Sequence, residues 1–362
     1  MSGEHHAVDR PVNHRPSAAD AARRRAARIS LGSGAFGVVV GLATVAVFGS
    51  PTMAVQYVPL VLSVLVFGVP HGAVDHLVLP RARNEPVTRR ALAAVGLLYL
   101  VVGGAYAVVW LYSPALAFAL FILVTLFHWG QGDVHALVGL AGADHLSSRP
   151  SRVLTLVVRG GLPMLVPLVA FPDQYAFVAG TLVGLFDPAA PAALEPVFEP
   201  SVRTAVAIGF GTLVALTLGL GYLRATSIGP WLIDAGETLG LLAFFALVPP
   251  IFAIGLYFTF WHSVRHILRT MLVDDVARQA LERGATGAAW MRFARDAAPL
   301  TAGALVVFGV VALAVPRTPA TLPDVVGLYL VGIALLTLPH VVVVSALDRE
   351  QGIWSVDGVD ED

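Results

Sequence analysis

The chain has 362 residues, of which 57% are hydrophobic and only 13% are charged, and its net charge is −1. A soluble domain carries about 25% charged residues, so this composition excludes an ordinary soluble protein and indicates a single bundle of membrane-spanning helices. The charge argues against nucleic acid as a partner. The absence of cysteine excludes thiolate metal sites, and the absence of lysine excludes a retinal Schiff base of the rhodopsin kind.

The first thirty residues are polar and precede the first long apolar run. We expect them to be disordered, with His5, His6 and His14 solvated rather than bound to a metal. No cleavable signal peptide is evident, because this polar segment stands in front of the apolar run. The expected domains are a disordered cytoplasmic tail, an integral membrane domain and a short acidic cytoplasmic tail, at residues 1–30, 31–348 and 349–362.

A helix needs roughly twenty apolar residues to cross a bilayer. Ten runs of this kind predict spans at 33–49, 54–79, 91–111, 115–140, 153–171, 203–223, 235–248, 251–268, 298–315 and 324–346. The seventh is short, and Pro249 and Pro250 either break one long helix or form a turn between two. The apolar stretch 175–186 is too short to span, so we expect it to be interfacial or re-entrant. The predicted fold class is an all-α, polytopic membrane bundle of about ten helices.

The arginines support this count of spans. Arg23, Arg24, Arg25 and Arg28 precede the first span, which by the positive-inside rule places the N-terminus in the cytoplasm. With ten spans, most other loop arginines fall on the inner side, whereas the long outer loop 172–202 carries four carboxylates and no arginine. We therefore expect a multi-pass protein of the cell membrane with both termini cytoplasmic.

Six histidines lie inside the predicted spans: His71, His76, His128, His262, His266 and His340. Ionisable groups in a bilayer are costly, so they are usually paired, face a cavity or serve a function. Imidazole is also the commonest protein ligand of transition metals. The four spans that carry these residues run in the same direction, and the depths of the histidines agree within roughly 10 Å. The pattern predicts a buried metal centre in the inner-leaflet half of the bundle.

Two of the motifs place candidate ligands close together in sequence. His262 and His266 are four residues apart and project from one helix face, a spacing that lets one helix give two ligands to one metal. Arg265, between them, is expected to extend to the inner surface or to bind Asp75 or Asp133.

Pro70 and Gly72 flank His71, so the second span is expected to be kinked there, with its backbone exposed to a cavity. We favour His71 as a metal ligand. His76 and Asp75 are expected to support the ligands from behind, with the carboxylate fixing the tautomer of an imidazole. The alternative for Asp75 is a simple hydrogen bond to a neighbouring helix.

His128 is a further candidate ligand, and the two glycines that follow it allow another helix or a bulky ligand to approach closely. Asp133 is a candidate supporting carboxylate. We expect His135 near the membrane interface and His145 solvated in a polar loop. His340 has three interpretations: a fifth ligand, a hydrogen-bond donor behind a ligand, or a packing histidine bonded to a backbone carbonyl.

These motifs, in this order, resemble the Brp/Blh family of membrane β-carotene 15,15'-dioxygenases. The resemblance spans residues 54–346 and excludes the N-terminal tail and the 172–202 loop. It rests on Pro-His-Gly-x-x-Asp-His at 70–76, Phe-His-Trp-Gly-x-Gly-Asp at 127–133, Trp-His-x-x-Arg-His at 261–266 and Leu-Pro-His at 338–340.

The resemblance implies that four histidines bind Fe(II): His71, His128, His262 and His266. It implies an enzyme that takes β-carotene from the lipid bilayer and uses O2 to cleave the central double bond into two all-trans retinal molecules, a product that a rhodopsin can receive. Four neutral imidazoles would leave coordination positions open for O2. The aromatic side chains beside the motifs pack helices or line a tunnel for a long apolar substrate.

Two other functions remain open at this point. One is a different membrane metal-oxygenase, such as a carotenoid hydroxylase or a desaturase, although the spans of this chain lack the HxxHH box typical of those diiron sites. The other is a metal or proton transporter lined by histidines. A transporter is expected to place polar groups along the whole depth of the membrane, whereas here they gather in one layer.

Overall fold

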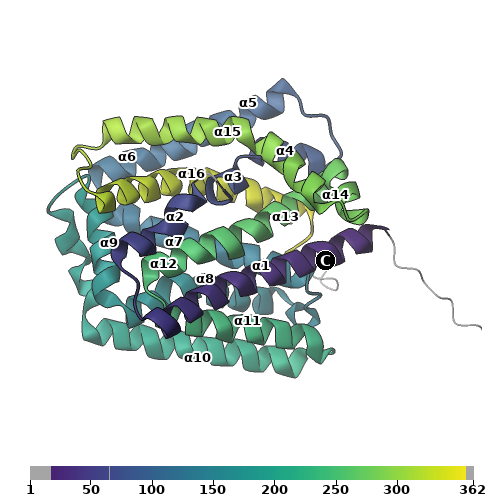
Figure 1. Ribbon diagram of the computed structural model, residues 1–362, viewed down its shortest axis with the longest axis horizontal. Coiled ribbons are helices and arrows are strands. Elements are labelled where there is room, and N and C mark those ends of the chain that lie inside the picture. Colours follow the sequence, from purple (N-terminus) through teal and green to yellow (C-terminus); the bar gives the residue numbers. More distant parts are fainter. Residues whose placement is uncertain (1–17, 65, 356–362) are drawn as a thin grey trace, which may run out of the picture.

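The computed structural model describes residues 18–64 and 66–355, and within them every regular element is helical, with no strand (Figure 1). The predicted all-α fold is therefore confirmed. The α-helices are α1 (Ala18–Phe48), α2 (Met53–Ser63), α3 (Gly68–Gly72), α4 (Asp75–Ala82), α5 (Arg89–Leu98), α6 (Gly104–Tyr112), α7 (Pro114–Gly139), α8 (Arg149–Ala170), α9 (Pro172–Gly184), α10 (Pro200–Arg224), α11 (Ile228–Leu247), α12 (Pro250–Leu256), α13 (Val264–Val273), α14 (Asp275–Glu282), α15 (Thr286–Ala314) and α16 (Leu322–Glu350). Two π-helical segments are η1 (Tyr99–Gly103) and η4 (Tyr257–Ser263), and two 3-10 segments are η2 (Asp144–Leu146) and η3 (Ala190–Phe198).

Nine helical runs in the described residues are long and apolar enough to cross a membrane, one fewer than the ten predicted. The predicted span that is missing from the nine is 251–268. It does form a continuous helical run, α12–η4–α13, but it carries two histidines and an arginine, which make it less apolar than the others. Nearly every residue of this run is buried. It is therefore an interior helix that carries polar side chains into the bundle.

Other boundaries also differ from the predictions. Helix α1 begins at Ala18, so the segment 18–30 is helical rather than part of a disordered tail. The three N-terminal histidines lie outside the described residues. The stretch 175–186 lies largely in α9, which has only thirteen residues, in agreement with a segment too short to span. Helix α11 ends at Leu247 and α12 begins at Pro250, so the seventh and eighth predicted spans are separate helices.

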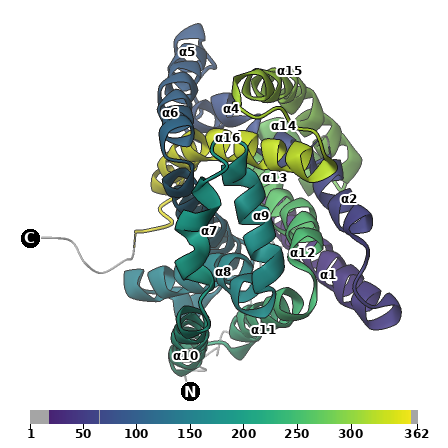
Figure 2. The same ribbon diagram turned by 90° about the vertical axis from the view of Figure 1, so that its left-hand side faces the viewer.

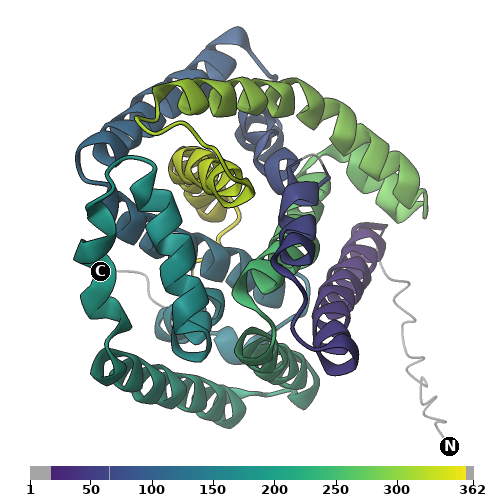
Figure 3. The same cartoon turned by 60° about the vertical axis from the view of Figure 1, so that its left-hand side comes forward.

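The helices surround a small number of interior elements. Helices α10 and α11 lie along one edge of the molecule, and α15, α5 and α6 lie along the opposite edge (Figures 1 and 2). Seen from the direction of Figure 3, the yellow helix α16 lies inside a ring of other helices. Helix α16 packs against α4, α7, α9, α15 and η1. The interior therefore brings α16 close to the elements that carry the histidine motifs.

The predicted kink in the second span is confirmed. The run Met53–Ala82 is divided into three helices, and His71 lies in the shortest, α3. Proline inside a helix removes a backbone donor and bends the helix, and Pro70 directly precedes His71. The break turns the chain at the level of the motif and exposes its side chains to the interior.

Glycines allow α7 and α8 to pack with their backbones in contact. A Cβ atom at Gly160 would lie 1.8 Å from the carbonyl oxygen of Leu126, and one at Gly130 would lie 2.1 Å from that of Leu156. Small residues at helix crossings permit this approach in membrane proteins. Gly130 is one of the two glycines for which the sequence predicted close packing. The crossing fixes α7, and with it the position of His128.

We predict that Gly160→Ala destabilises the protein by about 3 kcal/mol, because the new methyl group meets a backbone atom that no side-chain rotation can move. The matched control is Gly211→Ala, since nothing lies within 4 Å of a Cβ atom at this helical position. The control should be as stable as the wild type, or slightly more stable from helix propensity. Thermal unfolding of the detergent-solubilised variants measures both, and equal midpoints would contradict the packing argument.

Candidate metal centre

Five histidines from distant parts of the chain meet inside the bundle. We call them the histidine cluster: His71, His128, His262, His266 and His340. Each is at most 8% exposed. The centroids of neighbouring rings lie between 4.7 Å (His128 to His262) and 6.4 Å (His71 to His128) apart. The structure therefore brings together all four histidines that the resemblance implied as ligands, and it adds a fifth.

His71, His128 and His262 each have one ring nitrogen whose position the structure defines. His71 bonds through Nδ1 to the carbonyl oxygen of Gly68, one turn earlier, which leaves Nε2 for another partner. The Nε2 atoms of His128 and His262 are 3.1 Å apart. A hydrogen bond to one imidazole nitrogen sets the tautomer and orients the other nitrogen, as it does in metal-binding histidines.

His262 and His266 come from one helical run, as predicted. His262 lies at the end of the π-helical segment η4 and His266 follows in α13. Their rings are nearly parallel, with an interplanar angle of 17° and centroids 6.3 Å apart. The shared helix face predicted from the four-residue spacing is thus confirmed. Single π-helical turns inside α-helices are rare and frequently mark functional sites.

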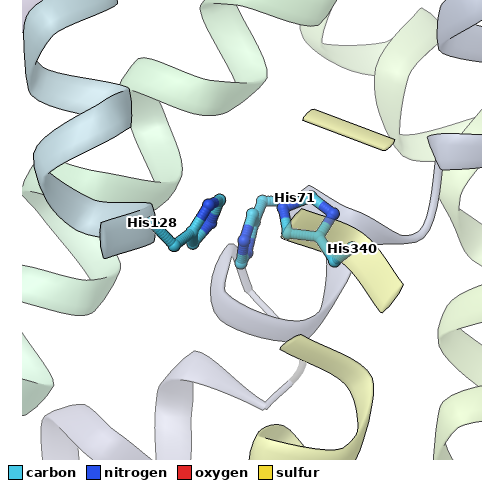
Figure 4. Close-up of side chains that lie close together, drawn as sticks. All are labelled: His71, His128 and His340. Atoms are coloured by element: carbon cyan, nitrogen blue, oxygen red, sulfur yellow. The ribbon is translucent and has the colours of Figure 1, made fainter. Parts of the chain in front are cut away.

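His340 belongs to the cluster and is not a packing histidine bonded to a backbone carbonyl. Its Nδ1 lies 2.7 Å from Oδ2 of Asp75. Its Nε2 is buried and has no hydrogen-bond partner among the described residues. The ligand nitrogens of His71, His128 and His340 lie within 4.8 Å of one another, and Figure 4 shows these three rings gathered between the helices that carry them.

Asp75 supports an imidazole, as predicted, and it does so from α4. Its Oδ2 accepts hydrogen bonds from His340 and from the hydroxyl of Tyr99, the latter at 2.6 Å. Ligand atoms of Asp75, His266 and His340 also lie within 4.8 Å of one another. His76, the other supporting candidate, lines the cavity beside the cluster, and its Nδ1 has no partner within the described chain.

The cluster has the donor set and spacing that a metal ion requires. Two nitrogens bound to one ion at ~2.1 Å lie roughly 3.0–3.4 Å apart for angles between octahedral and tetrahedral. The 3.1 Å separation between the Nε2 atoms of His128 and His262 falls in this range. A buried nitrogen without a partner, such as Nε2 of His340, is costly unless a ligand completes it. These buried side chains can therefore hold a metal ion.

A network of buried charges lies next to the cluster on the same helices. Asp133 accepts from Arg265 at 3.0 Å, from Trp261 Nε1 at 3.0 Å and from Arg159 at 3.4 Å. Of the alternatives for Arg265, the bond to Asp133 is the one observed, and its guanidinium also lies 4.0 Å over the Trp261 ring. Asp133 was predicted to support a ligand directly, but its partners are arginines and a tryptophan, so it acts on the helix that carries the histidines.

The network includes residues that the sequence analysis missed. Arg159 on α8 bonds to Asp234 at 2.8 Å and to Glu237 at 2.9 Å, both on α11, and Glu237 also pairs with Arg265. Their signal was present in the sequence, because charged residues inside apolar runs are as unusual as histidines there. The network joins α7, α8 and α11 to the interior run that carries His262 and His266.

Of two further histidines, His145 differs from its prediction. His145 is fully buried rather than solvated, and its Nε2 lies 2.9 Å from Asp234. The neighbouring Asp144 accepts hydrogen bonds from Thr226 and from the backbone of Ser227, and the bond from Thr226 lowers the pKa of the Asp144 carboxyl. His135 is 8% exposed and lies on α7, and its position near the membrane interface stays a prediction.

A large apolar cavity opens beside the cluster. Its volume is about 660 Å³, within the range of ~300–1,000 Å³ typical of ligand sites. Four cluster histidines lie on its wall: His71, His128, His262 and His340. The rest of the wall is mainly aliphatic and aromatic, with contributions from Phe118, Phe121 and Phe258. The arrangement suits a long apolar ligand held against a metal site.

Comparison with known proteins agrees with this geometry. The family model described as beta-carotene 15,15'-dioxygenase matches residues 62–348. The chain is 46% identical to the probable beta-carotene 15,15'-dioxygenase Blh of Halobacterium salinarum over 334 aligned residues. The aligned region covers 92% of this chain and 96% of the relative. The chain is 36% identical over 315 residues to the probable beta-carotene 15,15'-dioxygenase Brp of the same organism, covering 82% and 84%. No solved structure matches the chain.

We predict that Asp133→Ala destabilises the protein by about 3 kcal/mol, because Arg265 and Trp261 lose a buried hydrogen-bond acceptor, while Asp234 and Glu237 remain as counter-charges of the arginines. The control is Asp275→Ala, which removes an exposed partner of Arg278 and should cost at most about 1 kcal/mol. Chemical or thermal unfolding of both variants in detergent provides the comparison. A similar small loss in both would show that the buried network does not hold these helices together.

Proposed function

The chain belongs to the beta-carotene 15,15'-dioxygenase family, and we propose that it cleaves the central 15,15' double bond of β-carotene with O2 to give two all-trans retinal molecules. The observation that carries the proposal is the position of the histidine cluster on the wall of a large apolar cavity. A polyene in that cavity would lie directly against the side chains that can hold a metal.

The proposed reaction is balanced without other reactants. The carbon–carbon double bond breaks, and each of its two carbons receives one oxygen atom of O2 and becomes an aldehyde. No proton is gained or lost overall, and no external reductant is consumed. The protein therefore needs no nucleophile and no acid–base pair at the reacting carbons.

We propose Fe(II) as the resident metal, held by His71, His128, His262 and His266, with His340 as a fifth imidazole. Imidazole suits iron, and neutral ligands leave the ion its positive charge. Bound iron would supply the one-electron chemistry by which O2 reacts with a closed-shell polyene. Two observations support His340 as a ligand: its Nε2 has no partner among the described residues, and its Nδ1 is bonded to Asp75.

The chain's own residues would bind and orient the substrate. The aliphatic and aromatic wall of the cavity offers dispersion contacts along a polyene and excludes water from the reacting carbons. The bond that is cleaved would be set by where this wall holds the polyene relative to the cluster. Retinal would leave free, since the sequence contains no lysine to trap it as a Schiff base.

Substrate would enter from the lipid bilayer. Three apolar residues of the cavity wall are also more than a third exposed: Leu92 on α5, Phe177 on α9 and Leu300 on α15. Such residues place the cavity within reach of lipid, where a carotene dissolves. We propose that the protein resides in the cell membrane with both termini cytoplasmic and the cluster in the inner-leaflet half, and that a rhodopsin can take up the product.

A transporter is the less suitable alternative for this geometry. A hydrated metal ion or a proton needs polar groups along its path. The cluster instead opens onto a cavity whose walls are largely apolar, which suits a polyene. A carotenoid hydroxylase or desaturase shares the apolar cavity and is distinguished by its product.

We predict that the purified protein, given β-carotene, O2 and Fe(II), forms retinal as its only carbonyl product, because the reaction breaks one central bond. The reaction should be run under ¹⁸O2, and the retinal should be reduced to retinol at once, before its aldehyde oxygen exchanges with water. Chromatography and mass spectrometry should then show one labelled oxygen in each retinol molecule. Omission of Fe(II) from metal-stripped protein serves as the control. Aldehydes of unequal length would reject central cleavage, and a hydroxylated or desaturated carotenoid would point to a different oxygenase.

A further inference from the structure

Tyr99 lies at a junction between the cavity and the histidine cluster. Its hydroxyl donates to Oδ2 of Asp75 at 2.6 Å, and the same oxygen lies 2.7 Å from Nδ1 of His340. The ring of Tyr99 also forms part of the cavity wall. The residue therefore touches both the space for a ligand and the carboxylate that orients a cluster imidazole.

The orientation of the Asp75 carboxylate is set by hydrogen bonds, one of them from Tyr99, and not by a salt bridge to an arginine among the described residues. Asp75 is 2% exposed, and its hydrogen-bond partners among the described residues are Tyr99 and His340. Its other oxygen, Oδ1, is buried without a partner in that part of the chain. By contrast, Asp133 is paired with two arginines. With one oxygen unanchored, the orientation of the Asp75 carboxylate rests on the two donors that share Oδ2.

The backbone at Tyr99 is π-helical, and this is a second sign that the residue has a role at the site. The described residues contain two π-helical segments, η1 and η4, and each carries one residue of the histidine cluster or of its hydrogen-bonded support. Segment η4 carries His262, and η1 begins with Tyr99. Segment η1 packs against α16, which carries His340, and α4 with Asp75 packs against α5 and α16. A π-helical turn is less favourable than a regular one and is retained mainly where function requires the altered side-chain position.

We propose that Tyr99 is a positioning residue, which acts through Asp75 to fix the orientation and donor strength of His340 at the metal. This inference rests on the proposed metal centre and adds a residue that stands outside the histidine motifs. A carboxylate behind a metal-bound imidazole fixes its tautomer and raises its basicity, and loss of such support typically costs 10–100-fold in metal affinity. The tyrosine holds that carboxylate in place.

The test uses Co(II) as a visible probe of the full-length, metal-stripped protein in detergent. Tyr99→Phe should bind Co(II) roughly tenfold more weakly, the lower end of the range for such support, and should shift the Co(II) absorption band. The matched control is Tyr329→Phe, which removes another tyrosine hydroxyl from the same cavity wall, one that bonds to Ser63 at 2.9 Å. The control should keep the affinity and the spectrum of the wild type.

A double-mutant cycle separates positioning from a general loss of structure. If Tyr99 acts through Asp75, then Tyr99→Phe should add nothing to Co(II) binding in the Asp75→Asn background. Thermal midpoints of the two tyrosine variants should be similar, because each loses one hydrogen bond. Full additivity in the cycle or a wild-type Co(II) spectrum for Tyr99→Phe would overturn the inference. Equal changes in Co(II) affinity and absorption in both tyrosine variants would overturn it as well. None of these readouts uses β-carotene, so failure to cleave it would count against the proposed function alone.

Discussion

The burial of five imidazoles in an apolar helical bundle is the constraint on which the rest of the structure depends. Each imidazole carries two nitrogens that need partners, and water is excluded from the interior. Protein groups satisfy some of them, as in the bonds of His71 to Gly68 and of His340 to Asp75. Among the remaining nitrogens, Nε2 of His128 and Nε2 of His262 are 3.1 Å apart, and Nε2 of His340 has no partner among the described residues. A metal ion would complete these nitrogens together, which explains how such a cluster is tolerated inside a membrane protein.

The surrounding elements are arranged to bring these side chains to one level. The glycine contacts between α7 and α8 fix the helix of His128, and the break between α2 and α4 places His71 on a short helix. The buried charge network joins α7, α8 and α11 to the interior run with His262 and His266. Removal of one partner from such a network is costly because it leaves buried hydrogen-bonding groups unpaired. Several of these elements, among them α7, α8 and the short helix of His71, also line the cavity, so the site and the space for its substrate share part of one framework.

Much of this arrangement could be predicted from sequence, because intramembrane histidines, helical spacing and proline positions have direct structural consequences. The convergence of His71, His128, His262 and His266, the kink near Pro70 and the support of an imidazole by Asp75 were predicted correctly. Three features could not be predicted. The burial of the run near His262 was not predicted, because apolar length alone does not distinguish a lipid-facing helix from a buried one. His145 was expected in solvent because its partner, Asp234, is 89 residues away. Tyr99 was not considered because its role depends on a π-helical turn and on contacts across three helices.

Metal analysis of purified protein can show whether the histidine cluster holds iron. Iron per chain should be measured by mass spectrometry for the wild type, for single alanine variants of the five cluster histidines, and for His135→Ala, whose ring lies outside the cluster. We predict one iron per wild-type chain, its retention in His135→Ala, and a large loss in each cluster variant, His340→Ala included. Stoichiometric zinc without iron in the wild type would contradict the assignment of the metal. Full iron content in the cluster variants would contradict the centre itself.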